Sequence, residues 1–154
     1  MQAEKKSQVA SSTRQIESVV VKAPLGKLWE PIRCLKFEEL FPSRITKSEY
    51  VKGNPGIVGS LVKVTFKDGS KWTYCINEIS DLNHRVIYEL VETDPKCTVT
   101  SAMNEIRLHC VTDDNSTFIK WETNFSNDAD VNVLQDNKFK KIDYFNDLKK
   151  ACSC

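Results

Sequence analysis

The chain has 154 residues, of which 40% are hydrophobic and 28% charged, and 22 basic against 21 acidic residues leave a net charge of +1. This is the composition of one ordinary globular domain, without the one-sided positive field that nucleic-acid binding needs or the ~20-residue apolar run that spans a bilayer. We expect no nucleic-acid or membrane partner and, without an apolar signal segment, a cytoplasmic monomer.

The six cysteines and two histidines form no metal-binding pattern. His84 and His109 are far apart, and no CxxC or HxxxH spacing occurs. In a reducing compartment we expect the cysteines to be free thiols. The sequence predicts neither a metal nor another cofactor.

Residues 1–13 are rich in Ser, Lys and Gln and predict a disordered tail, so the folded domain is expected over 14–150. From Arg14 polar and apolar residues alternate up to Ala23-Pro24, which predicts a first strand. Apolar residues then recur at helical spacing from Leu25 to Ile32 and predict a short helix. Residues 35–41 predict a second short helix.

The middle of the chain predicts β-structure. From Ile45 to Phe125 no helical period is sustained, and turn residues recur at near-regular intervals. Short connections between consecutive strands indicate an antiparallel meander. The six predicted strands cover residues 44–52, 58–67, 71–80, 85–92, 98–111 and 117–125.

After Asp128 apolar residues return at helical spacing up to Leu148, which predicts a helix of roughly twenty residues. A curved sheet with one solvated face must cover the other, and this helix is the largest element available for it. The predicted fold class is α+β, with a seven-stranded curved antiparallel sheet wrapped around the long C-terminal helix. A cavity is expected between sheet and helix.

The order of elements resembles the helix-grip fold of the birch-pollen-allergen and START-like superfamily, which includes polyketide cyclases and dehydrases. The residues that carry the resemblance are Val21-Lys22-Ala23-Pro24 with Leu28-Trp29, Phe41-Pro42-Ser43, Lys47-Ser48, the segment 53–60, Asp81, Tyr88 and Trp121. The resemblance implies a cavity that binds a small hydrophobic molecule, and in some members cyclisation, dehydration or isomerisation there. Fold likeness alone does not choose among these activities.

Two motifs have alternative interpretations. The segment Gly53-Asn54-Pro55-Gly56-Ile57-Val58-Gly59 could suggest a phosphate loop, but a strand follows it, so a hairpin that needs glycine at positive φ is expected. Residues 151–154 include Cys152 and Cys154 and resemble a prenylation signal. Without a GTPase domain, we expect a frayed end with two unmodified thiols.

Strand alternation predicts which side chains face the helix. The residues expected to line the cavity from the sheet are Val64, Phe66, Trp72, Tyr74, Tyr88, Leu90, Asn104, Ile106 and Trp121. From the long helix the expected lining residues are Gln135, Lys138, Phe139 and Ile142. Lys138 is unusual on an apolar face. It can snorkel to the cavity mouth, hold a carboxylate or phenolate, or act as an amine if desolvation lowers its pKa.

The favoured hypothesis is binding of a small hydrophobic or aromatic molecule between sheet and helix. Compared with the onion sulfenic-acid-processing enzymes that the chain also resembles, Val62 replaces an Arg, and Cys75, or Tyr74 with a one-residue shift, replaces a Glu. No catalytic acid/base pair is therefore assigned. The alternatives are a cofactor-free cyclase, dehydratase or isomerase in the same cavity, and a cochaperone-like interaction module that would expose apolar surface.

Overall fold

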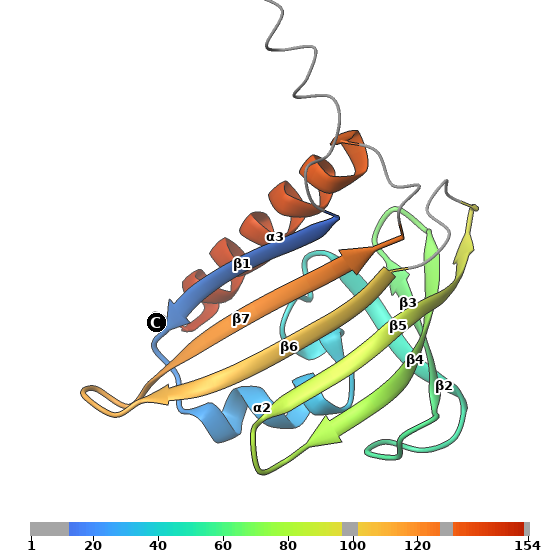
Figure 1. Cartoon of the computed structure of the whole chain (residues 1–154). Helices are drawn as coiled ribbons and strands as arrows, with labels where there is room; N and C mark the ends of the chain where they lie inside the picture. The colour runs from blue at the N-terminus through green and yellow to red at the C-terminus, as the bar shows by residue number, and fades with distance from the viewer. Residues whose placement is uncertain (1–12, 97–101, 127–130, 153–154) are drawn as a thin grey trace, which may run out of the picture.

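The computed structural model describes residues 13–96, 102–126 and 131–152 and has the predicted helix-grip architecture (Figure 1). The elements are β1 (Arg14–Val21), α2 (Leu25–Arg33), the 3₁₀ helix η1 (Phe37–Glu39), β2 (Ile45–Lys52), β3 (Leu61–Phe66), β4 (Lys71–Ser80), β5 (Arg85–Asp94), β6 (Ala102–Val111), β7 (Ser116–Phe125) and α3 (Val131–Cys152). The α+β fold class is confirmed.

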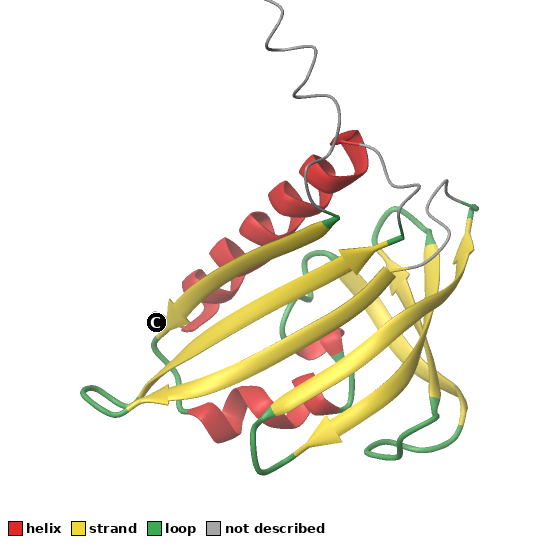
Figure 2. Cartoon of the chain, viewed as in Figure 1, coloured by secondary structure: helices red, strands yellow, loops and turns green. Residues whose placement is uncertain are grey.

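The seven strands form one antiparallel sheet in the order β1-β7-β6-β5-β4-β3-β2 (Figure 2). β2 to β7 are a meander, and β1 joins its far edge, where Gln15 lies opposite Thr123 of β7. The register between β4 and β5 shifts twice, where Val91 of β5 and Asn77 of β4 are left without a partner. Such bulges increase the bend of a strand and so help the sheet to curve.

Of the two predicted short helices, the first is confirmed and the second is a single 3₁₀ turn. α2 buries Leu28, Trp29 and Ile32 on one side, as the three- and four-residue spacing predicted. Leu35 has a φ of 56°, in the left-handed region, so a helix cannot run through it. The chain instead turns sharply, and η1 places Phe37 inside the molecule.

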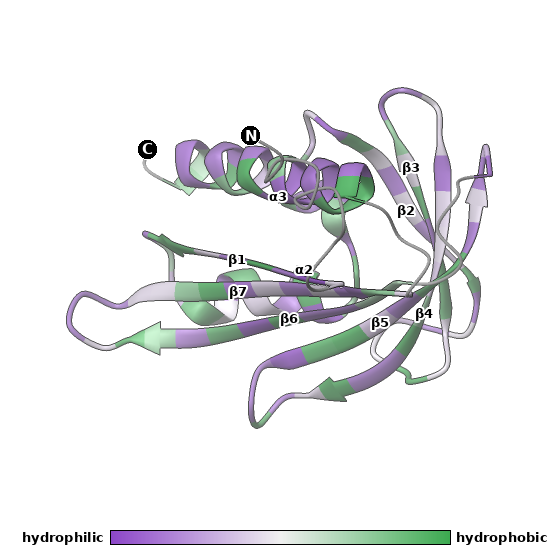
Figure 3. Ribbon diagram, turned by 45° about the horizontal axis from the view of Figure 1, so that its top comes forward, coloured by the Kyte–Doolittle hydropathy of each residue, from purple (hydrophilic) through white to green (hydrophobic). Residues whose placement is uncertain are grey.

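α3 lies on the side toward which the sheet curves and packs beside β1 (Figure 3). Its C-terminal half buries Phe145 and Leu148 against the core. α2 contacts β5 and β6 at the end of the sheet where Val86, Ile106, Leu108 and Ile119 are buried. The hydrophobic core therefore fills one end of the space between the sheet and α3.

The segment 53–60 is the connection between β2 and β3 and is followed by a strand, as expected for a hairpin loop. Gly53, Gly56 and Gly59 all have φ between 84° and 92°. A Cβ at Gly53 would lie 2.2 Å from Ser60 Oγ, whose hydroxyl donates to Asn54 O at 3.1 Å. The glycines are thus needed for the conformation of this loop.

Within the described ranges no helix is long and apolar enough to cross a membrane. Cys34, Cys75, Cys110 and Cys152 are free thiols. Cys152 is the last residue of α3, so the helix continues into the end that was expected to fray. Residues 1–12 of the expected tail, residues 98–101 of the expected strand 98–111, and Cys154 lie outside the described residues.

Candidate functional site

A cavity of about 570 Å³ lies between the concave face of the sheet and α3. This volume is within the range of sites that hold small organic molecules, roughly 300–1,000 Å³. The side chains that line it come from η1, from β2 to β7 and from α3. It occupies the other end of the space between sheet and helix, which the hydrophobic core does not fill.

Eight of the nine residues predicted from the sheet lie together on the cavity wall. They are Val64, Phe66, Trp72, Tyr74, Tyr88, Leu90, Asn104 and Trp121. Ile106, the ninth, is buried in the hydrophobic core and does not line the cavity. Strand alternation places it on the correct face, but the end of β6 that carries it is covered by α2. Contact of the eight with a ligand remains a prediction.

The wall is built from aromatic rings that contact one another. Phe66 meets Trp72 edge-on at 5.9 Å between centroids, and Tyr74 meets Tyr88 edge-on at 5.1 Å. Phe37 lies 5.9 Å from Tyr88 and joins these pairs from η1. Rings packed in this way hold each other in place, so the wall offers a ligand a firm apolar surface.

Three polar side chains of the cavity wall lie next to one another on the neighbouring strands β5, β6 and β7. Tyr88 lies opposite Asn104, and Asn104 lies opposite Thr123. The Thr123 hydroxyl donates to Asn104 Oδ1 at 2.6 Å, which provides a partner for the buried amide oxygen. Burial raises the pKa of Tyr88 well above its ordinary value, so its hydroxyl stays protonated and can act as a donor.

The prediction for the inner face of α3 is wrong. Gln135, Lys138 and Phe139 are exposed, Phe139 by 58%, and Ile142 is half-buried away from the cavity wall. The residues of α3 that line the cavity are instead Val133, Asn137, Lys141 and Tyr144, together with Asp136 and Lys140 at the solvent-exposed rim. The error has a physical reason: an amide and an amine occupy inner positions, so apolar residues do not mark that face.

The sequence analysis missed several cavity residues, among them Phe37, Lys141 and Tyr144. Phe37 depends on the turn at Leu35, which no local pattern shows. The phase of α3 could have been set from Phe145 and Leu148, from which steps of about four residues lead back to Lys141 and Asn137. The buried lysine is therefore Lys141 and not Lys138.

Charged residues surround the cavity where its lining is exposed to solvent. Lys67, Asp68, Asp136 and Lys140 line this side. The ammonium of Lys140 pairs with Asp136 at 3.2 Å, and Ser70 donates to Asp68 at 2.6 Å. The two carboxylates in the cavity lining thus have polar partners at the rim, and the described residues provide no carboxylate in its aromatic interior. No group of His, Cys, Asp and Glu side chains suited to a metal ion occurs among them.

Solved structures with this fold come from bacteria and plants. A protein of Nitrosospira multiformis has a TM-score of 0.76 at 22% identity, over 90% of this chain and 95% of that one. The allergen Ara h 8.0201 has a TM-score of 0.70 at 21% identity, over 90% and 96%. Major latex-like protein 151 of Panax ginseng has a TM-score of 0.73 at 13% identity, over 90% and 96%.

These likenesses show that the fold is the one common to birch-pollen-type allergens and START-like proteins. No protein-family model and no curated protein matches the sequence.

Proposed function

We propose that the protein binds one small hydrophobic molecule in the cavity between sheet and α3. The observation that carries the proposal is the cavity itself, about 570 Å³ in volume and walled by aromatic side chains. Apolar cavities with a few placed polar groups are the usual form of small-molecule sites. The fold is also that of the allergen Ara h 8.0201 and of the ginseng latex-like protein.

The lining suits binding of an apolar molecule with a few polar atoms. Its aromatic interior presents hydroxyls, an amide and the amine of Lys141, which donates to the main-chain oxygen of Gln15, while the carboxylates of the lining are at the rim. Phe66, Trp72 and Leu90 would contact the apolar body of the ligand. Tyr74, Tyr88 and Asn104 would hydrogen-bond its polar atoms, since an unpaired buried polar group costs about 1–3 kcal/mol.

Tryptophan fluorescence tests the proposal. Of the three tryptophans, Trp72 and Trp121 line the cavity, while Trp29 is a buried residue of α2 outside the lining. Titration with flavonoids, fatty acids, sterols and anilinonaphthalene dyes should give quenching that saturates at one equivalent for at least one ligand class. Absence of saturable binding across this panel would contradict the proposal.

Two adjacent positions on β6 give a matched pair of variants. Ala102 is buried in the cavity wall, and Met103 is 38% exposed on the opposite face. Ala102→Phe fills the cavity and should weaken binding by at least roughly tenfold, whereas Met103→Phe adds a ring outside and should leave affinity unchanged. Equal affinities in the two variants would place the binding site elsewhere.

A further inference from the structure

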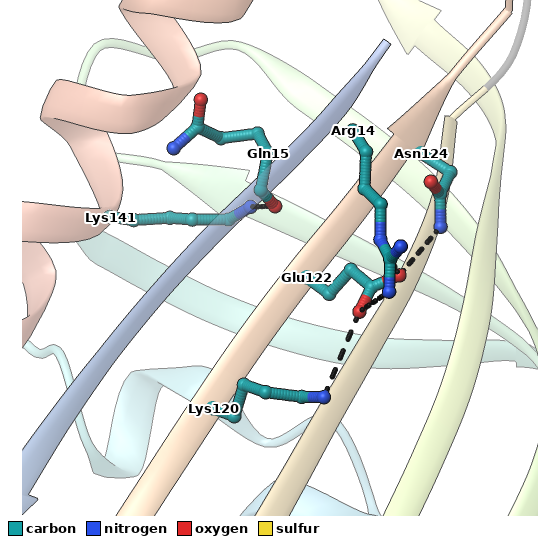
Figure 4. A network of polar contacts seen from close by, with 6 residues as sticks. All are labelled: Arg14, Gln15, Lys120, Glu122, Asn124 and Lys141. Carbon is teal, nitrogen blue, oxygen red and sulfur yellow. Dashed lines mark hydrogen bonds and ion pairs between the residues drawn. The ribbon is translucent and has the colours of Figure 1, made fainter. Parts of the chain in front are cut away.

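Lys141 is the most deeply buried charged side chain among the described residues, with 2% of its surface exposed. It projects from α3 toward β1 and lines the cavity (Figure 4). Its Nζ donates a hydrogen bond to the main-chain oxygen of Gln15 at 3.1 Å and lies 5.8 Å from the centroid of the Trp121 ring. The amine is thus held between the helix, the edge strand and the aromatic wall.

No carboxylate forms an ion pair with Lys141 within the described ranges. Glu17 on β1 accepts a hydrogen bond from Gln15 Nε2 at 2.6 Å. Glu122 on β7 is held on the other face of the sheet by Arg14, at 2.9 Å, and by Asn124 (Figure 4). The charges of both carboxylates raise the pKa of Lys141 from a distance, but both carboxylates already have other hydrogen-bond partners.

The surroundings of the amine disfavour its charged form. Burial lowers the pKa of Lys141 from 10.5 to about 7, and the charges of Glu17 and Glu122 only partly oppose this effect. An ammonium has three protons to donate, and the main-chain oxygen of Gln15 accepts one of them. A buried cation normally has an anionic partner, and here the described chain does not supply one.

The preceding residue on α3 has a different environment. The ammonium of Lys140 is exposed at the rim and pairs with Asp136 at 3.2 Å. Among the described residues, the buried cation without an anionic partner is therefore Lys141, inside the cavity.

We propose that Lys141 gives the cavity a preference for amphipathic ligands that end in a carboxylate. The inference rests on the proposed binding function and deepens it by naming the ligand class. The carboxylate would accept from Lys141 Nζ and complete the ion pair, while the apolar body lies against Phe66, Trp72 and Leu90. An ion pair formed in this way stabilises the protonated amine, so binding takes up a proton when the amine was neutral before.

Matched acid and amide ligands test the preference. The pairs are dodecanoic acid with dodecanamide, and 2-naphthoic acid with 2-naphthamide, titrated by calorimetry at pH 8. The wild-type protein should bind at least one acid roughly tenfold or more tightly than its amide. Lys141→Met should remove that difference, and Lys138→Met, which removes an exposed lysine of α3 outside the cavity lining, should retain it.

Proton uptake provides a readout that a structural role for Lys141 would not produce. Titrations of the acid in two buffers of different ionisation enthalpy should show uptake of up to one proton in the wild type, and none in Lys141→Met. This measurement on the wild type tests the inference even if the variant fails to fold.

Equal affinity for acid and amide in the wild type, or a preference retained by Lys141→Met, would overturn the carboxylate inference and leave the binding function intact. Failure of both ligand pairs and of the fluorescence panel to bind would contradict the proposed function itself.

Discussion

Thr123 and Asn104, side by side on β7 and β6, share a 2.6 Å hydrogen bond in the cavity wall, and both are buried. Thr123→Val removes the donor at nearly constant volume and leaves the Asn104 oxygen without this partner. We expect a loss of about 1–3 kcal/mol in the free energy of unfolding, measured by urea denaturation.

The double variant Thr123→Val with Asn104→Leu should be less destabilised than the sum of the single variants, because it removes both partners together. Additive effects would show that the hydrogen bond contributes little to stability.

Lys141 should make stability depend on pH. The pKa of its amine is about 7 in the folded protein and 10.5 as a reference for the unfolded chain. Between these values the unfolded chain binds the extra proton, so the folded state gains stability as pH rises, by up to about 1.4 kcal/mol per pH unit. Lys141→Met should therefore be more stable than the wild type at pH 6, and the difference should shrink toward pH 9.5.

Urea unfolding of both proteins at several pH values measures this difference. The contributions of the other titrating groups are the same in both proteins and cancel in it. A difference that is constant from pH 6 to 9.5 would mean that the Lys141 amine is solvated and keeps its ordinary pKa.

Asp81 links α2 to the turn between β4 and β5. Arg33 and the indole nitrogen of Trp29 both donate to its carboxylate at 2.9 Å, and these hydrogen bonds lower its pKa. The stabilisation is present above the ordinary pKa of 3.8 and is lost as pH falls through the lowered value. Because the carboxylate is 64% exposed, Asp81→Asn should cost no more than about 1 kcal/mol at pH 7.

Chemical denaturation of wild type and Asp81→Asn at pH 7 and at pH 2.5 measures this contribution. The difference in stability should narrow at the lower pH, and a difference of the same size at both would show that the charge is not responsible.

Two glycines offer a test of the loop between β2 and β3. Gly53→Ala introduces a Cβ at positive φ, 2.2 Å from Ser60 Oγ, and should cost about 1–3 kcal/mol. Gly26→Ala in α2 meets no atom within 4 Å and should leave stability unchanged or raise it by up to about 1 kcal/mol. Thermal unfolding compares them, and equal melting temperatures would contradict the strain at Gly53.

The sheet was predictable because alternation is a local property. The immediate neighbours of Tyr88 and Trp121 in the sequence indicate which face of the sheet these residues occupy. The one bulge in β4, at Asn77, comes after Trp72 and Tyr74 and leaves both on the cavity wall. The phase of α3 was not predictable from apolar residues, because Phe139 is exposed while Lys141 is buried.

The boundary between the hydrophobic core and the cavity could not be predicted from the sequence either. Asn104 and Ile106 are neighbours on the same face of β6, yet only Asn104 lines the cavity. The boundary depends on how far α2 and η1 fill the space under the sheet. That is a property of the tertiary packing, and strand patterning contains no information about it.

Native mass spectrometry of the protein purified from its own cells without denaturation tests the central claim most directly. We predict a species that carries one noncovalently bound small molecule per chain, present at the same level in Met103→Phe and strongly depleted in Ala102→Phe. A protein that has only its own mass, and that takes up no member of the hydrophobic panel added in excess, would contradict the claim that this cavity is a binding site.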